Sequence, residues 1–501
     1  MKKYITLLFV LALFDHSFAQ PSSRIPEFQL NKDEIKSQLM YIASDELAGR
    51  RTGSEGEAKA ADFIARYFEA CGVAKPANQE TYYQVIPFAR IQPPQTASLQ
   101  LAETKFEQGN ALLITKGGPV HAQTTAVFAG HAWVDENAGI DDFKNLDVEG
   151  KVVFALPGIP DSKSPFQAFR ASAKKRGWAK QHGAIGLVEL YRLRMPWRFF
   201  KNYLTKERLE IQTPEEVADQ REFFAAWIRE DDAPVISQLE KGGLVPVAVE
   251  SKGMVSEKAR SVNVVGVIRG SDEKLKDEYV LLSAHFDHMG VGKQGGGAVT
   301  EQDSIFNGAR DNGMGVVALL AAAKALAVHP PARSVILLAC TGEEMGMLGS
   351  SYYAAHPLVP LTQTVFNLNT DGAGYNSKEH ISIIGWGRTN TGAEIEKAAA
   401  ALNLKVAKNP EPQQNLFERS DNVSFARKGV PAIDLSPGFT KMDEEIFKYY
   451  HQVADNPESI DYDYLLTFCK SFVYTARLIA DKAETPAWTP GDKFEKKTGK
   501  D

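Results

Sequence analysis

Two stretches near the N-terminus place apolar residues at helical spacing, one over about 31–42 and one over about 54–70. Each is preceded by a residue that caps helices, Asn31 or Ser54, with a Glu three positions later, which is the spacing of a capping box. The polar positions between the apolar ones define a solvent face. The pattern predicts two amphipathic helices that pack on a core.

The C-terminal half alternates between short apolar runs and longer helical patterns. Val262–Ile268, Tyr279–Ala284, Ser334–Cys340 and Thr364–Asn369 are strand-like, and Gly313–Val328 between them is an Ala- and Leu-rich helix. Such alternation is typical of an α/β fold whose strands run parallel under covering helices. We therefore expect a mostly parallel central sheet flanked by helices.

Between residues 92 and 252 the pattern changes to short β-rich runs separated by Gly- and Asp-bearing turns. A helical pattern over Phe166–His182 interrupts them, as does an aromatic, charged segment from Pro196 to Asp232 that is helix-like near Glu207–Arg229. A chain of 501 residues exceeds what one core usually absorbs. The pattern predicts a β-rich domain, 92–252, inserted into a larger discontinuous domain made of 24–91 and 253–482.

The two ends of the chain predict segments outside these domains. A basic start, an apolar run (Ile5–Phe14) too short to span a bilayer, and the small residue Ala19 together indicate a signal peptide over 1–19. We therefore expect an exported protein, either periplasmic or extracellular. No later segment predicts a transmembrane helix, and the Pro- and Lys-rich end, 483–501, is predicted to be disordered.

Composition narrows the classes of partner. Hydrophobic residues make up 44% of the chain and charged residues 24%, an ordinary balance for a globular protein. The net charge of −6 and the lack of a basic stripe argue against nucleic acid as a partner. Three cysteines, none in a CxxC or Cys/His cluster, favour neither a disulfide scaffold nor a thiolate metal site.

Histidine and carboxylate residues gather where the predicted strands end. They are His285 and Asp287 after Tyr279–Ala284, Asp311 before the long helix, Glu343-Glu344 after Ser334–Cys340, Asp371 after Thr364–Asn369, and His451 farther along the chain. In open α/β sheets, ligands bind beyond the carboxyl ends of the strands. Each residue alone is a weak signal, but their joint occurrence at successive strand ends indicates a metal site.

Two imidazoles and three carboxylates are ligand types that suit divalent metals, above all zinc. If one carboxylate bridges, the set serves two ions, which together deprotonate a water and polarise a carbonyl. Neighbouring loop side chains can point in different directions, so one of Glu343 and Glu344 can bind metal while the other faces the water, acts as general base and passes the proton to the leaving amine. Asp287 suits a role in orienting the imidazole of His285. His288 is interpreted as a supporting or structural residue.

These motifs resemble those of the co-catalytic zinc aminopeptidases typified by secreted bacterial leucine aminopeptidases, which are related to glutamate carboxypeptidase II and glutaminyl cyclases. The matching runs cover most of residues 262–460: Ser283–His288, Gly308–Gly313, Thr341–Glu344, Asn367–Asp371 and Tyr450-His451. The inserted block, with Asp147–Val153 and Ala179–Leu187, is less specifically similar to a protease-associated domain. The resemblance implies a zinc exopeptidase fold of the phosphorylase/hydrolase-like type.

The resemblance also implies a role for each residue. It assigns five residues to two Zn²⁺ ions: Asp311 bridges them, His285 and Asp371 complete one site, and Glu344 and His451 complete the other. Glu343 is then the general base, and a strained peptide is expected after Asp311. The implied activity is that of a metallopeptidase that removes N-terminal residues from peptide substrates.

Two residues near the predicted site are candidate substrate contacts. The family commonly carries a His after the Ser-Asp pair found here at Ser420-Asp421, and this chain has Asn422 instead. We hypothesise that Asn422 supplies an amide hydrogen bond to the substrate, with a plain turn residue as the alternative. Arg310 is either a carboxylate-binding residue or a partner in a structural ion pair.

Other activities are open on the same metal core. A carboxypeptidase or dipeptidase is one, because nothing in the sequence identifies what binds the charged end of the substrate. Glutaminyl-peptide cyclisation, which related enzymes perform with a single zinc, is another. A non-catalytic binding protein is the least favoured, because all five predicted ligands and the base are present.

Overall fold

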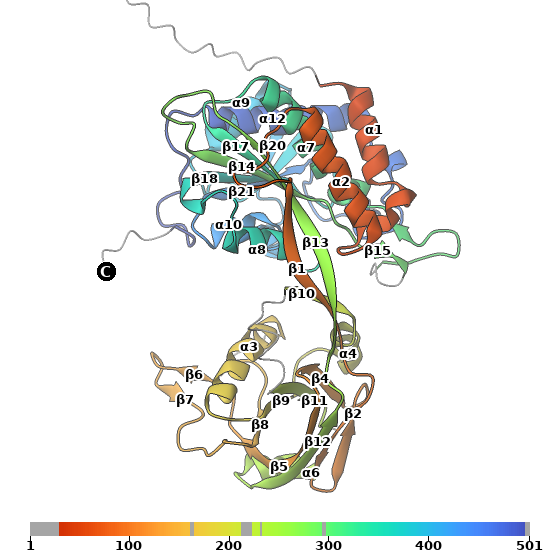
Figure 1. Cartoon of the computed structure of the whole chain (residues 1–501), viewed down its shortest axis with the longest axis vertical. Helices are drawn as coiled ribbons and strands as arrows, with labels where there is room; N and C mark the ends of the chain where they lie inside the picture. The colour runs from red at the N-terminus through yellow and green to blue at the C-terminus, as the bar shows by residue number, and fades with distance from the viewer. Residues whose placement is uncertain (1–29, 161–164, 212–222, 231–232, 293–296, 496–501) are drawn as a thin grey trace, which may run out of the picture.

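The computed structural model describes residues 30–160, 165–211, 223–230, 233–292 and 297–495, arranged in two lobes (Figure 1). A long two-stranded ribbon joins the lobes. It consists of β1 (Tyr83–Gln92) and β13 (Val255–Ile268), which pair antiparallel from Tyr83↔Val264 to Gln92↔Val255. The predicted signal peptide, 1–19, lies outside the described residues.

The larger lobe is built on a nine-stranded sheet. In spatial order its strands are β10 (Arg208–Ile211), β1, β13, β17 (Ser334–Cys340), β14 (Tyr279–His285), β18 (Thr364–Asn369), β21 (Ala432–Pro437), β19 (His380–Ile384) and β20 (Lys405–Lys408). The run β17-β14-β18-β21 is parallel, as is the pair β19-β20, and the other neighbours are antiparallel. The sheet is therefore mixed rather than mostly parallel as predicted, in part because the two legs of the ribbon must run in opposite directions.

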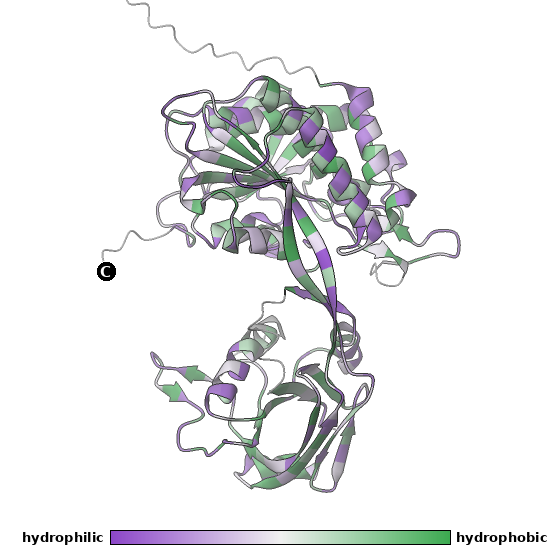
Figure 2. Ribbon diagram, in the orientation of Figure 1, coloured by the Kyte–Doolittle hydropathy of each residue, from purple (hydrophilic) through white to green (hydrophobic). Residues whose placement is uncertain are grey.

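Helices cover both faces of this sheet. One face carries α1 (Lys32–Ile42), α2 (Glu55–Ala70), α7 (Met314–Val328), α9 (Gly392–Ala400) and α12 (Tyr462–Ala480), and the other carries α8 (Leu348–Ala355) and α10 (Asn422–Ala426). Alternate residues of β14 face the two cores, Val280 and Leu282 on one side and Leu281 on the other. Figure 2 shows the apolar strands enclosed by helices with polar outer faces. The two predicted N-terminal helices are present, capped by Asn31 and Ser54.

One helical stretch, Ala309–Val328, is long and apolar enough by composition to cross a membrane, with a mean hydropathy of 1.4. It includes α7, and 83% of that apolar window is buried inside the molecule. Packing against the sheet and against α12 makes it the central helix of the larger core.

The smaller lobe has its own eight-stranded sheet, within residues 97–251. In spatial order its strands are β3 (Thr104–Glu107), β2 (Ala97–Leu101), β12 (Val245–Ser251), β5 (Val120–Phe128), β8 (Val152–Ala155), β9 (Gly186–Leu190), β11 (Phe224–Ile228) and β4 (Leu112–Lys116). Its helices are α3 (Pro165–Gln181), α4 (Trp197–Leu204) and α6 (Pro234–Glu240). Buried residues such as Leu99, Phe154 and Val188 form a core separate from that of the larger lobe. Two short strand pairs lie outside the main sheets: β6 (Val134–Asp135) with β7 (Ile140–Asp141), and β15 (Gly290–Val291) with β16 (Ile305–Phe306). The short helix α11 (Glu444–Phe447) belongs to the larger lobe.

Two details of this lobe differ from the sequence prediction. β10 falls inside the inserted block but pairs with β1, so it extends the sheet of the larger lobe. The stretch near Glu207–Arg229, predicted to be helix-like, contains β10 and β11 instead, and all five residues of β11 are buried between β9 and β4. The strand pairing of these segments therefore outweighs their local charge pattern. Residues 212–222, between the two strands, lie outside the described residues.

The C-terminal end, 483–501, was predicted to be disordered, and this is wrong for residues 483–495. Trp488 is buried against Phe417 and Val423 of the larger lobe. Arg388 donates two hydrogen bonds to the Asp492 carboxylate, each 2.8 Å long. The aromatic anchor and this bidentate ion pair hold a segment whose composition alone indicates disorder.

Candidate metal centre

The predicted ligands come from loops at one edge of the larger sheet. His285 ends β14, Glu344 follows β17, and Asp371 follows β18. These three strands are parallel neighbours, so their carboxyl ends meet at the same edge. Asp311 enters from the turn before α7, and His451 from the loop after α11. Residues that are far apart in the chain thus lie close together at this edge of the sheet. The peptide bond between Asp311 and Asn312 is cis.

Asp311 lies at the centre of the cluster. Its Oδ1 is 3.4 Å from His285 Nε2, and its Oδ2 is 3.2 Å from His451 Nε2. His285 Nε2 is also 3.0 Å from Asp371 Oδ1, and His451 Nε2 is 3.3 Å from Glu344 Oε2. One carboxylate therefore presents each of its oxygens to a different imidazole–carboxylate pair, which is the arrangement of a bridging ligand.

His288, which sequence reasoning left outside the ligand set, lies in the same cluster. It is fully buried, and its donor atoms converge with those of Asp311 and Glu344. His288 Nδ1 is 2.7 Å from Glu344 Oε1, but the two atoms do not meet at a hydrogen-bonding angle and neither has another hydrogen-bond partner among the described residues. Buried polar atoms are almost always paired. These unpaired atoms fit a group that accepts lone pairs, as a metal ion does.

The charges of the cluster favour a cation. Burial and the charge of Asp311 raise the pKa of Glu344, but the neighbouring imidazoles of His288 and His451 outweigh them and bring it to about 2. Burial lowers the pKa of His451, but contacts with Asp311 and Glu344 raise it to about 10. In both cases the pairing of opposite charges outweighs desolvation. The site therefore attracts positive charge, whether protons or metal ions.

Glu343 has different surroundings from its neighbour Glu344. Its side chain lines the cavity and takes part in none of the ligand contacts above. Burial raises the pKa of Glu343 well above its ordinary value, and the charge of Asp371 raises it further. Its backbone N–H donates to Asp287 Oδ1 over 3.1 Å. Glu343 is thus a basic carboxylate held at the edge of the cluster.

Asp287 contacts the loops that carry the proposed site residues without lining the cavity. It is fully buried and is not among the described residues that line the cavity. Its Oδ2 accepts a hydrogen bond from Thr52 Oγ1 over 2.8 Å, and its Oδ1 lies 3.8 Å from His285 Nδ1. Asp287 therefore connects the His285 loop to the Glu343 loop and positions both.

Two buried residues that sequence reasoning missed fix the ligand loops through backbone contacts. The Arg50 guanidinium donates to the carbonyl oxygens of Phe286 and Gly308, over 2.8 and 3.0 Å. The Asp455 carboxylate accepts the backbone N–H groups of Arg310 and Asp311, over 2.9 to 3.1 Å. Sequence reasoning gave neither residue a role, because their contacts join segments that are distant in the chain.

The structure does not bring Arg310 or Asn422 to the cavity. The Arg310 guanidinium lies 3.6 Å from the centre of the Tyr449 ring and donates to the Ser459 carbonyl over 3.0 Å. Asn422 is fully buried in α10, and its amide donates to the Phe417 carbonyl over 3.1 Å. Both side chains have structural contacts, and neither is among the described residues that line the cavity.

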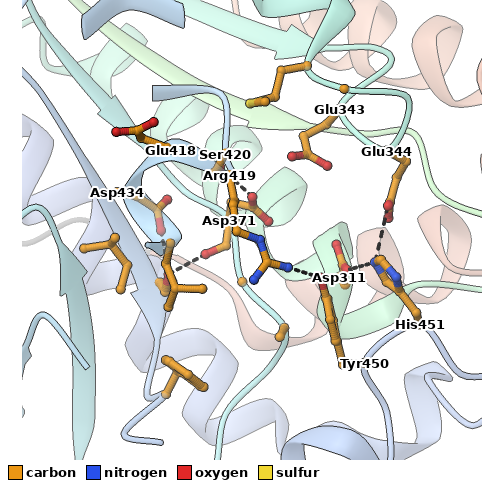
Figure 3. A pocket seen from close by; sticks show the side chains of 18 of the residues that line it. Asp311, Glu343, Glu344, Asp371, Glu418, Arg419, Ser420, Asp434, Tyr450 and His451 are labelled. Atoms are coloured by element: carbon orange, nitrogen blue, oxygen red, sulfur yellow. Dashed lines mark hydrogen bonds and ion pairs between the residues drawn. The ribbon is translucent and has the colours of Figure 1, made fainter. Parts of the chain in front are cut away.

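The cluster opens into a cavity of about 560 Å³, a size typical of sites for small ligands. Figure 3 shows the labelled side chains of its wall, among them Arg419, which sequence reasoning also missed. Arg419 Nη2 is 3.5 Å from Tyr450 Oη. Apolar residues form another part of the wall: Met347, Ile384, Leu416, Phe439 and Met442. Tyr203 is the one described lining residue that comes from the smaller lobe.

Comparison with known proteins identifies a peptidase family whose model matches part of this chain. Residues 263–476 match the model of peptidase family M28. The vacuolar membrane protease of Saccharomyces cerevisiae is 39% identical over 114 residues, and aminopeptidase YwaD of Bacillus subtilis is 24% identical over 267 residues. The aminopeptidase from Aneurinibacillus sp. strain AM-1 has a similar fold, with a TM-score of 0.53 and 18% identity over 90% of this chain and 94% of that one.

The matched segments cover only part of these relatives, 10% of the yeast protein and 52% of the B. subtilis protein, and 23% and 52% of this chain. The yeast relatives also correct one prediction. They are named vacuolar membrane proteases, which contradicts the expected periplasmic or extracellular localisation. That prediction is therefore wrong on this comparison, which relates the chain to membrane-bound proteins.

Proposed function

Residues 263–476 of this chain belong to peptidase family M28, and on that premise we propose that the protein is a metallopeptidase with two zinc ions that removes N-terminal residues from peptides. The observation that carries the proposal is the placement of Asp311. Its two carboxylate oxygens face different histidines, His285 and His451, at 3.4 and 3.2 Å. A shared carboxylate between two imidazole–carboxylate pairs suits two metal ions held close together.

The donor set suits zinc. Imidazole nitrogens and carboxylate oxygens are its common ligands, and none of the cysteines belongs to the described metal-binding groups. His285 and Asp371 would hold one ion, Glu344 and His451 the other, and Asp311 both. When bound, the ions supply Lewis-acid chemistry, lowering the pKa of water and polarising the carbonyl of the scissile bond.

The residues around the ligands perform the proton transfers. Glu343 takes a proton from the attacking water and delivers it to the leaving amine. Its buried position, which raises its pKa, makes it a stronger base than an exposed Glu. The Tyr450 hydroxyl, which burial keeps protonated by raising its pKa, and the Arg419 guanidinium line the cavity as hydrogen-bond donors for the developing oxyanion.

The charge of the cavity supports recognition of an amino terminus rather than a carboxyl terminus. Outside the proposed ligands, Glu343, Glu418 and Asp434 line its wall, and Arg419 is the one basic lining residue described apart from histidine. Burial raises the pKa of Asp434 well above its ordinary value, so Glu418 and, when ionised, the proposed base Glu343 are the carboxylates that attract an ammonium group and repel a terminal carboxylate. Arg310, the residue considered for carboxylate binding, is held away by its aromatic neighbours.

A substrate panel tests the proposal. The purified protein is assayed on unblocked peptides, N-acetylated peptides, peptides with a C-terminal glutamate, and peptides beginning with glutamine, alongside metal analysis. We expect hydrolysis at the free N-terminus of the peptides that have one and no turnover of N-acetylated peptides. We also expect two zinc equivalents per chain, loss of activity with EDTA and recovery with zinc. Turnover of N-acetylated peptides would favour a carboxypeptidase instead, and pyroglutamate formation with one zinc would favour a cyclase.

The smaller lobe is proposed to be a protease-associated domain covering residues 92–252. Its separate core and its own sheet support an independent unit. Neither of the described metal-binding groups lies within it.

A further inference from the structure

Among the described residues of the smaller lobe, Tyr203 alone lines the catalytic cavity. All the other described lining residues belong to the segment 311–451 of the larger lobe. Tyr203 lies near the end of α4, which Figure 1 shows at the junction of the two lobes. An inserted lobe thus supplies part of the wall of a site that the other lobe builds.

The end of α4 is fixed beside the catalytic loop by the strand that follows it. β10 begins four residues after α4 and pairs with β1, and the Glu207 carboxylate lies 2.7 Å from Arg90 Nη1. Leu209 of β10 belongs to a small apolar cluster that includes Met345. Met345 directly follows Glu343-Glu344 in the chain. The position of Tyr203 is therefore tied to the loop that carries the proposed base.

Within α4, one aromatic side chain is buried in the smaller lobe, and two others are exposed to solvent. Phe200 is fully buried, with its ring centre 5.0 Å from that of Trp227 and 5.4 Å from that of Phe169. Tyr203 is 69% exposed and contacts Phe169 edge-on at 5.8 Å. Phe199, one helical turn earlier, is 53% exposed but is not among the described residues that line the cavity. The helix thus holds a large, mostly solvent-exposed ring at the mouth of the cavity.

Resting on the proposed aminopeptidase function, we propose that Tyr203 binds the part of the peptide that lies downstream of the scissile bond. An exopeptidase encloses the terminal residue, so the rest of the peptide must leave through the mouth of the cavity. Met442 and Phe439 belong to the catalytic lobe's wall, whereas Tyr203 is exposed and comes from the other lobe. A Tyr side chain offers a flat apolar surface and a polar tip at low entropic cost, which suits contact with varied peptide backbones.

The test compares substrates of increasing length in matched variants. Tyr203→Ala, Tyr203→Phe and the control Phe199→Ala are assayed on aminoacyl p-nitroanilides, dipeptides, tripeptides and tetrapeptides sharing one N-terminal residue. We expect Tyr203→Ala to lower kcat/KM about tenfold on tripeptides and tetrapeptides, mainly through KM, and to leave p-nitroanilides within about twofold. Tyr203→Phe should retain most of the wild-type preference, and Phe199→Ala should behave as wild type.

Thermal midpoints and bound zinc are measured for each variant, since an exposed ring should change neither. An equal effect of Tyr203→Ala on all substrate lengths, or no effect on any, would overturn the role of Tyr203 and leave the proposed aminopeptidase activity standing. Failure of the wild-type protein to hydrolyse any unblocked substrate would instead overturn the proposed function, and this inference with it.

Discussion

Glu343 and Glu344 are adjacent in the chain, yet only Glu344 contacts the histidines of the proposed metal site, His288 at 2.7 Å and His451 at 3.3 Å. Replacing each by Gln should therefore have different effects. Glu343→Gln removes a proton carrier while leaving the ligands intact, and we expect kcat to fall by about 10²- to 10⁴-fold with bound zinc unchanged. Glu344→Gln removes a charged ligand and should lower the zinc content. Steady-state kinetics together with metal analysis by mass spectrometry separate the two outcomes.

The pair of variants also serves as its own control, because the substitutions are chemically identical and one position apart. If Glu343→Gln lost zinc as Glu344→Gln does, Glu343 would be a ligand rather than the base. If Glu343→Gln kept zinc and near-normal kcat, the base would have to be sought elsewhere on the cavity wall.

Asp455 acts on the cluster through the backbone. Its carboxylate accepts the N–H groups of Arg310 and Asp311, and burial raises its pKa to about 6. Asp455→Asn replaces one acceptor oxygen by a donor, which should loosen the turn that presents Asp311. We expect zinc affinity to fall about 10- to 100-fold, measured by competition with a chromogenic chelator. Asp463→Asn, in an exposed position on α12, is the control and should leave zinc affinity unchanged.

At this scale the sequence predicted residues that stand in motifs and missed those that act through distant backbone contacts. His285 and Asp371 were identifiable because each lies within two residues of the end of a predicted strand. Arg50 and Asp455 were not identifiable in this way. In the hydrogen bonds that connect them to the ligand loops, their partners lie more than 140 residues away in the chain. Arg310 was considered for substrate binding from its place beside Asp311, but adjacency in the chain does not fix the direction of a side chain.

The contact of α2 with β13 and with the residue after β17 contains a buried acid with a shifted pKa. Glu57, in the first turn of α2, accepts hydrogen bonds from Ser261 Oγ, Thr341 Oγ1 and the Gly53 N–H, the last over 2.8 Å. Burial raises its pKa to about 8 from an ordinary value of 4.5. The folded state thus holds this proton more tightly than the unfolded state does. The contribution of Glu57 to stability is therefore lost as pH rises from about 4.5 to about 8.

Glu57→Gln should remove that pH dependence. A Gln side chain can accept from the Gly53 N–H and donate to the Ser261 and Thr341 hydroxyls, so the local packing is kept. We expect the variant to gain stability over the wild type as pH rises from 5 to 8, by an amount on the order of a few kcal/mol. Urea unfolding at both pH values measures the difference. A constant difference across this range would mean that Glu57 titrates normally in the folded protein.

At the scale of elements, the sequence indicated the strands that pair locally or lie in the centre of the sheet better than those at its edges. Ser334–Cys340, in the parallel part of the sheet, is buried at every position and reads as a nearly continuous apolar run. β10 has only four residues and joins β1 from more than 100 residues away in the chain. Such pairing depends on how the two lobes meet, which no local pattern records.

The two lobes have separate cores and unequal shares of the tryptophans, and this makes them distinguishable in the whole molecule. Four of the six tryptophans lie in the smaller lobe, Trp133, Trp178, Trp197 and Trp227, and two lie in the larger lobe. The described metal-binding groups all lie in the larger lobe. Tryptophan fluorescence therefore reports mainly on the lobe that is not proposed to bind metal.

Removing zinc should then destabilise one lobe more than the other. A ligand that binds only the folded state stabilises it by mass action, and metal at about 100 times its dissociation constant adds roughly 2.7 kcal/mol. For a lobe of this size, EDTA should lower the calorimetric transition of the larger lobe by roughly 4 °C. The transition seen by tryptophan fluorescence should move far less, because the smaller lobe is joined to the larger mainly through β1, β13 and β10. Glu344→Gln, lacking a ligand, should show the low transition without EDTA. If the fluorescence and calorimetric transitions moved together by the same amount, the ribbon and α4 would couple the two lobes into one cooperative unit.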